Sequence, residues 1–315
     1  HPLWLAGFRP FFALACLAGM FLPLAWALFY SGLLPAPAGP FTPAQWHAHE
    51  MFFGFGWAVL GGFLLTATKN WVSVRGWHGA ALAWLACAWL VERLGMALGG
   101  NWPPPLFLLS NNLFLGSIIA MLMWTLLRHH AQDSYRDNGF FLLVLPAFLV
   151  AKTLLLHGEH FAAGHGMALA LFRMAFLVMM ERTLTQFMRG NFQVDILRRP
   201  LLDNAIMYIG YLLIVVQLVV QALGRLEAPA WTGSVSVHLF SFGVMGTVIP
   251  AMLVRISKGH TGRKVTFDAL DRAVLYLMLV ALALRVVAPQ LLPAAYLLWL
   301  QLAAACWFAC FGILG

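Results

Sequence analysis

A short run of histidine and acidic residues stands at the start of an apolar segment. It reads Trp46-His47-Ala48-His49-Glu50-Met51, and neutral imidazole is the commonest metal ligand in proteins, suited to haem iron, copper and zinc. On a helix, His47 and Glu50 share a face, whereas His49 points about 200° away from His47. The pattern therefore favours two separate centres, or one histidine that orients the other. The alternative is a pair of interfacial histidines beside a belt of aromatic side chains.

A second candidate ligand, His238, begins another apolar segment. Met245 follows it two helical turns later on the same side, and a thioether is a soft metal ligand. Gly243 and Gly246 thin this segment, which would let another helix or a flat macrocycle approach closely. A lone histidine of this kind is more often a satisfied core residue, so ligation and a structural role are weighed equally.

The loop after this segment is rich in hydrogen-bond donors and glycine. It runs from Ser257 to Lys264 and includes His260 and Arg263. Such a loop can hold an anion, for example a haem propionate or a phosphate. It is equally typical of a basic loop on the cytoplasmic side of a membrane. It is not a P-loop, because the GxxxxGK[ST] spacing is absent.

The elements that must position these residues are membrane helices. Of the 315 residues, 62% are apolar and 10% are charged, whereas soluble domains carry roughly 25% charge. A bilayer core needs about 20 mostly apolar residues per helix. The sequence therefore predicts an all-α fold, a polytopic transmembrane helix bundle of about ten helices, forming a single domain over residues 1–315. The predicted spans are Phe8 to Leu33, His47 to Thr68, Gly79 to Leu98, Pro104 to Leu127, Gly139 to His157, Ala162 to Thr185, Leu201 to Leu223, Val235 to Val254, Ala273 to Val287 and Leu292 to Gly315.

The distribution of basic residues predicts the orientation. Most Lys and Arg residues fall on the same side of the membrane as the N-terminus, whereas only Lys152, Arg225 and Arg285 fall on the other side. The positive-inside rule therefore places the N-terminus in the cytoplasm. The chain begins without Met and ends inside an apolar segment, so we expect it to be trimmed at both ends.

Ionisable residues inside the spans need partners, because charge is costly at membrane depth. Glu92 and Arg93 are expected to form a buried pair or a helix-locking contact, and Glu181 with Arg182 is expected to pair or to snorkel near the inner surface. Arg173 requires a carboxylate, a carbonyl or a propionate. No ladder of carboxylates crosses the membrane, so the sequence shows no proton relay.

Several of these motifs resemble the NnrS family. They are Leu5 to Phe12 (LAGFRPFF), Trp46 to Phe55 (WHAHEMFFGF), Gly62 to Ala67 with Asn70-Trp71, His238-Leu239-Phe240 with Gly243 to Gly246, and Arg255 through Gly259 to Arg263. They cover the first two spans and the eighth span with its loop. Between them the resemblance lies mainly in hydropathy. Met180-Glu181-Arg182 keeps only the arginine of a Gly-Gly-Arg segment that relatives carry.

The resemblance implies a protein of the bacterial inner membrane that contains haem, expected to be b-type, and copper. It implies a link to denitrification and nitric oxide stress, with nitric oxide as the ligand. It also suggests twelve spans, whereas this chain supplies ten. The residues that match the family motifs, and that the resemblance implies as ligands of haem or metal, are His47, His49, Glu50, His238 and His260, with Arg263 as a further contact to the cofactor.

Three functions therefore compete. The first is a haem and copper protein that binds or removes nitric oxide. The second is a transporter or chaperone of haem or copper, which broken helices in corresponding halves or an internal repeat would favour; the sequence shows no convincing repeat. The third is a membrane subunit that assists assembly of another complex.

Overall fold

The computed structural model describes residues 1–191, 201–226 and 231–315, and in these ranges the chain is helical without any strand. Ten helical stretches are long and apolar enough to cross a membrane, which confirms the predicted number. The spans are Phe8–Tyr30, Pro43–Trp71, Ala80–Asn101, Pro104–Arg128, Asn138–Leu156, Gly158–Arg182, Ala205–Leu226, Val235–His260, Ala269–Leu291 and Pro293–Leu314.

The chain divides into two compact units, residues 1–22 with 32–171 and residues 23–31 with 172–315. The expectation of a single domain is not tested by this division and stays a prediction. The first unit contains α2 (Pro43–His49), the π-helix η2 (Glu50–Gly56), α3 (Trp57–Trp71), α4 (Ala80–Leu98), α5 (Pro104–Arg128) and α6 (Phe141–Leu156).

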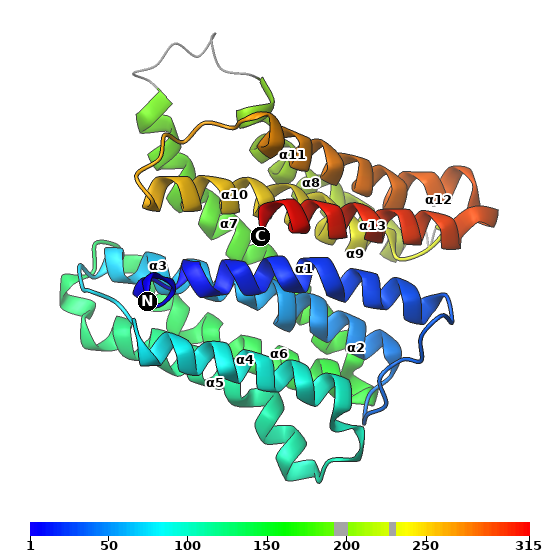
Figure 1. Ribbon diagram of the computed structural model, residues 1–315, viewed down its shortest axis with the longest axis horizontal. Coiled ribbons are helices and arrows are strands. Elements are labelled where there is room, and N and C mark those ends of the chain that lie inside the picture. Colours follow the sequence, from blue (N-terminus) through cyan, green and yellow to red (C-terminus); the bar gives the residue numbers. More distant parts are fainter. Residues whose placement is uncertain (192–200, 227–230) are drawn as a thin grey trace. The chain divides into compact units, whose positions relative to one another are not determined.

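The second unit contains α8 (Leu201–Leu226), α9 (Val235–His238), the π-helix η8 (Leu239–Met245), α10 (Gly246–His260), α11 (Ala269–Leu282), the π-helix η9 (Ala283–Val287), α12 (Ala288–Leu291) and α13 (Tyr296–Leu314). Two helices contribute to both units, α1 (Phe8–Tyr30) and α7 (Phe161–Asn191). Figure 1 shows α11 and α13 running alongside each other, and α4 beside α5.

The second span begins at a well-defined cap. Thr42 accepts a hydrogen bond from the Gln45 amide, and the Gln45 side chain accepts one from the Thr42 amide, with Pro43 as the first helical residue. This capping box satisfies amides that a helix start leaves unpaired. The helix therefore starts four residues before the predicted boundary at His47. Gln45 also donates to the Leu155 carbonyl at 3.1 Å, which fixes α2 against α6.

The two most buried spans are Pro43–Trp71 and Val235–His260, with 78% and 83% of their apolar windows buried. Each is interrupted by a seven-residue π-helix, η2 in the first unit and η8 in the second. A π-helix hydrogen-bonds five residues apart, so it shifts the angular position of every side chain after it, and such segments are frequent at functional sites. The sequence patterns gave no sign of these interruptions.

Small residues allow α1 to cross α3 closely in the first unit. A Cβ added to Gly62 would lie 2.8 Å from Cβ of Phe11, and one added to Gly7 would overlap Leu65. The Phe8 amide donates to the Thr66 hydroxyl at 3.0 Å, which closes the crossing with a polar contact. The core of this unit therefore lies around α3, beneath its flanking helices.

In the second unit, α11 begins at a capping box between Asp268 and Asp271. The Asp271 amide donates to the Asp268 carboxyl, which holds the pKa of that carboxyl below its ordinary value. Lys258 reaches from the end of α10 to both carboxylates. The loop after α10 is therefore tied to the next span at its start.

Candidate functional site

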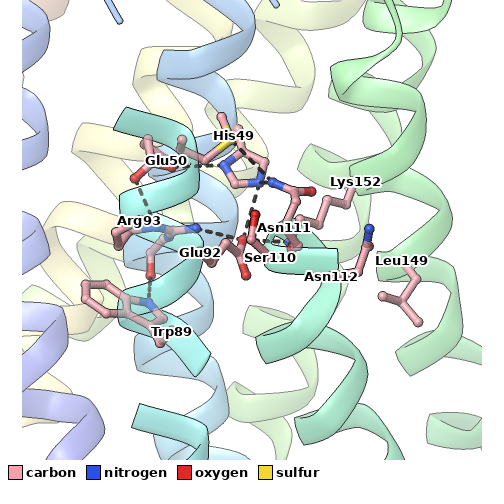
Figure 2. Close-up of polar contacts among 12 residues, drawn as sticks. His49, Glu50, Trp89, Glu92, Arg93, Ser110, Asn111, Asn112, Leu149 and Lys152 are labelled. Carbon is pink, nitrogen blue, oxygen red and sulfur yellow. Dashed lines mark hydrogen bonds and ion pairs between the residues drawn. The ribbon is translucent and has the colours of Figure 1, made fainter. Parts of the chain in front are cut away.

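A buried cluster of ionised side chains lies inside the first unit (Figure 2). Four elements supply it: α2 ends with His49, η2 begins with Glu50, α4 carries Glu92 and Arg93, and α6 carries Lys152. His49, Glu92 and Lys152 are fully buried, and Glu50 is 2% exposed. Charges at this depth are costly unless they are paired, so the contacts among them decide what the cluster can do.

His49 is held on both sides of its ring. Its Nδ1 atom lies 3.0 Å from Oε1 of Glu50, and its Nε2 atom lies 3.2 Å from Nδ2 of Asn111. The amide nitrogen of Asn111 can only donate, so Nε2 accepts and the proton of a neutral ring sits on Nδ1, donated to Glu50. Nε2 also lies 3.4 Å from Oε1 of Glu92. Both ring nitrogens therefore face protein side chains.

Glu92 forms ion pairs with both cations of the cluster. Its Oε1 atom lies 2.6 Å from Nζ of Lys152 and 2.7 Å from Nη2 of Arg93. Lys152 also donates to the Asn111 carbonyl, which ties α4, α5 and α6 together at one point. Within the described residues, Oε2 of Glu92 has no hydrogen-bond partner.

Arg93 connects the cluster to the π-helix. Its Nε atom lies 3.2 Å from Oε2 of Glu50, and its guanidinium packs where a side chain on Gly54 would stand. The indole of Trp89 donates to the Gly54 carbonyl at 3.0 Å and lies under the guanidinium, 5.2 Å from ring centre to Cζ. Gly54 is thus required by the close approach of α4.

The cluster is electrically balanced. Two carboxylates, Glu50 and Glu92, face two cations, Arg93 and Lys152, and His49 is neutral in the tautomer that Asn111 imposes. Such a set fixes four helical elements in register. It also offers an unpaired carboxylate oxygen and a ring between two carboxylates, which is the chemistry of a proton-holding or polar-ligand site.

The structure brings some predicted ligands together and separates others. His49 and Glu50 are in direct contact, and His47 lies half-buried two residues before His49 on α2. His238 and His260 stand at opposite ends of the span Val235–His260, about 33 Å apart at 1.5 Å per residue. These last two histidines therefore do not share one metal ion.

His238 has the geometry of an oriented imidazole. Its Nδ1 atom lies 2.7 Å from the Ser234 carbonyl, which can only accept, so the ring proton is on Nδ1 and the lone pair is on Nε2. Phe242 packs 5.9 Å from the ring, and Trp307 packs 5.2 Å from Phe242. Leu213 of α8 packs against Gly243, and Met278 of α11 packs against Gly246. The space that the two glycines leave is therefore filled by side chains of neighbouring helices.

His260 and Arg263 are both exposed, at the end of α10 and in the turn that follows. Their roles as ligand and cofactor contact stay predictions. Across residues 1–191, 201–226 and 231–315, no group of three or more His, Cys, Asp or Glu side chains is placed to hold a metal ion.

A chain of polar side chains connects α7, α8 and α9 in the second unit. Arg173 of α7 donates to Gln221 of α8 at 3.0 Å, and Gln217 donates to both Gln221 and Ser236, at 3.2 and 3.0 Å. The predicted need of Arg173 for an oxygen partner is thus met by an amide. In the part of the chain that the structure describes, Nε of Arg173 and Oε1 of the fully buried Gln217 lack hydrogen-bond partners.

Sequence reasoning missed two members of the first-unit cluster. The sequence places Lys152 only on the outer side of the membrane, but it is fully buried against Glu92. A lone lysine inside the run from Phe141 to Leu156 was the available signal. Asn111 gave none, because an uncharged amide in an apolar helix has many ordinary roles. The predicted pairs Glu92 with Arg93 and Glu181 with Arg182 are confirmed.

Ten apolar spans and a paired cluster of buried charges define a polytopic helical membrane protein. The sequence model of the family described as NnrS protein matches residues 2–208 and 194–315, which is essentially the whole chain. The chain therefore belongs to the NnrS family. Searches among curated proteins and among solved structures found no match.

Proposed function

We propose that the chain is a haem-containing integral membrane protein that binds or removes nitric oxide. The family supports this proposal, and one observation carries it: His238 starts the most buried span with its Nδ1 proton donated to a backbone carbonyl. Metal-bound histidines almost always donate their other ring N–H in this way, which fixes the ring and leaves Nε2 to the metal.

The second unit fits a haem by the chemistry of its polar atoms. His238 supplies an imidazole, and Arg173 supplies a guanidinium whose Nε atom is buried without a hydrogen-bond partner in the described residues. A haem carries carboxylates, and arginine binds carboxylates well. His238 would therefore hold the iron and Arg173 a propionate. His47, half-buried in the first unit, is a further candidate ligand.

Copper is supported by the family resemblance alone. The described ranges assemble no cluster of three or more ligating side chains, so they do not fit a copper site of that kind. The predicted ligation by His49 and Glu50 stays a prediction, because those side chains bind each other and the neighbouring charges. We derive no step through copper.

When bound, ferrous haem supplies an iron that takes up nitric oxide. Residues of the chain orient the histidine that would bind this iron. The Ser234 carbonyl orients His238, and the rings of Phe242 and Trp307 keep water from its inner side. The guanidinium of Arg173, held by the polar chain that runs to Ser236, would bind an anionic group.

The test is a titration of nitric oxide into the purified, reduced protein. The proposal expects a Soret band that shifts in proportion to the nitric oxide added, and continued consumption of nitric oxide in the presence of a reductant would separate turnover from binding. His130→Ala serves as a control, because that histidine is exposed and belongs to none of the candidate ligands. A colourless protein would contradict the proposal.

A second candidate, transport or delivery of haem or copper, is favoured by the π-helices that interrupt both central spans. Broken helices at corresponding positions mark the binding sites of many transporters. If an added apoprotein removed the haem or copper from the purified protein, that transfer would favour a transport or delivery function. A cofactor retained at one per chain under the same conditions would favour binding or turnover.

A further inference from the structure

The helix boundaries of the first unit recur in the second at a constant spacing. The π-helix η2 covers residues 50–56 and η8 covers 239–245. The helices that follow them cover 57–71 and 246–260, and the next spans begin at Ala80 and Ala269. Each shift is 189 residues (239 minus 50, 246 minus 57, 269 minus 80). The spans that follow begin at Pro104 and Pro293, which are again 189 residues apart (293 minus 104).

The side chains at the break also recur. His49 and His238 are each the last residue before the π-helix. Each ring packs on the phenylalanine four residues later, Phe53 at 5.6 Å and Phe242 at 5.9 Å. A glycine follows in both cases. π-Helices account for well under 1% of residues in proteins, so coincidence is a poor explanation of two at one register with the same flanking residues.

The repeat corrects the sequence expectation that the halves share no convincing internal similarity. The common spacing indicates that residues 43–126 and 232–315 are two copies of one three-span unit, although the π-helix η9 of the second copy has no counterpart in α4. Each span of the first copy has its counterpart six spans later along the chain. His238 therefore corresponds to His49 and not to His47.

The second copy has lost the charges of the first. Glu50, Glu92, Arg93 and Asn111 correspond to apolar residues, which are Leu239, Ala281, Leu282 and Leu300. The positions still meet: Leu239 and Leu282 pack in one apolar cluster with Val235 and Val286, where Glu50 and Arg93 form an ion pair in the first copy. The two positions therefore remain neighbours in both copies, but an apolar contact in the second copy stands where the first has an ion pair.

We propose that the two copies have divided one ancestral site between two tasks. In the first copy, the neutral ring of His49 is fixed between Glu50, Asn111 and Glu92 as part of the charged cluster and does not coordinate a metal. In the second copy, His238 stands at the same position among apolar counterparts and coordinates a metal centre of low net charge through Nε2. This assignment rests on the proposed function, whereas the repeat itself does not.

The repeat is tested by moving the first copy's ion pair into the second. Leu239→Glu, Leu282→Arg and the double variant are compared with wild type by thermal unfolding and yield in detergent. Each single variant buries an unpaired charge and lowers the unfolding temperature. The double variant is expected to recover much of that loss, because the repeat places the two side chains as Glu50 and Arg93 are placed. If the double variant lost the sum of the two single-variant decreases in unfolding temperature, or were less stable than both single variants, the repeat would be overturned.

The division of tasks is tested by His49→Gln and His238→Gln, with haem per chain measured from the optical spectrum of purified full-length protein. His238→Gln is expected to lose or shift the Soret band, while His49→Gln keeps its position. Loss of haem in His49→Gln with retention in His238→Gln would overturn the assignment. A colourless wild type would contradict the proposed function and the ligand assignment, and the exchange of the ion pair would still decide the repeat.

Discussion

Lys152 is the residue whose removal should damage the buried cluster most. Lys152→Met leaves Glu92 with one cation fewer in a fully buried place. Breaking a buried ion pair by removing one partner costs roughly 3–5 kcal/mol of stability. We therefore expect a marked fall in the unfolding temperature of the detergent-solubilised protein. Lys264→Met, at an exposed loop position, is the control and should change little; equal effects in the two variants would contradict the role of the cluster.

Arg173 is the residue that distinguishes an anion contact from simple packing. Arg173→Met is expected to lower the haem content per chain, since it removes the guanidinium whose Nε atom the described protein leaves unpaired. Arg173→Lys keeps the charge but not the planar fork, so an intermediate content is expected. Arg225→Met, at the exposed end of α8, is the matched control. Unchanged haem content in Arg173→Met would exclude the contact.

Among the contacts of individual residues, the sequence predicted those between chain neighbours and missed those between distant residues. Paired charges such as Glu92 with Arg93 were predictable, because two ionisable residues in one apolar span leave few alternatives. Lys152 and Asn111 were not, since their partners are 60 and 62 residues away in the chain and no local pattern encodes that distance.

At the scale of elements, the close approach of α6 and α7 depends on one glycine. A Cβ at Gly164 would run into the backbone of Leu154 and Leu155, whereas a Cβ at Gly166, two residues later on the same helix, would meet nothing within 4 Å. Gly164→Ala is therefore expected to destabilise by about 1–3 kcal/mol or more. Gly166→Ala should be neutral or slightly stabilising. Thermal unfolding of both variants tests this, and equal behaviour would contradict the packing.

The ten spans were predictable because hydropathy decides them. Some boundaries moved, at the cap Thr42 for example, and at the end of the eighth span, which lies at His260 and not at Val254. The π-helices were not predictable. A change from four-residue to five-residue hydrogen bonding alters no composition and little periodicity over seven residues. The repeat was hidden for a related reason: His49, Phe53 and Gly54 match His238, Phe242 and Gly243, but most other matched positions carry interchangeable apolar residues.

For the whole molecule, the basic residues predict that the N-terminus and the loops at 72–79 and 261–268 face the cytoplasm. Alkaline phosphatase, which is active only outside the cytoplasm, should be active when fused after Ala38 and inactive when fused after Gly76. A fluorescent protein that matures only in the cytoplasm should give the opposite pattern. Phosphatase activity after Gly76 would contradict the predicted orientation.

We propose that the second unit holds a haem through His238. The optical spectrum of purified His238→Gly protein, recorded before and after addition of imidazole, tests this proposal beside wild type and the exposed-loop control His130→Gly. We expect the Soret band of His238→Gly to be weakened or shifted and to return towards that of wild type with imidazole, while the band of His130→Gly is unaffected. A His238→Gly spectrum identical to wild type, with no response to imidazole, would contradict ligation by His238.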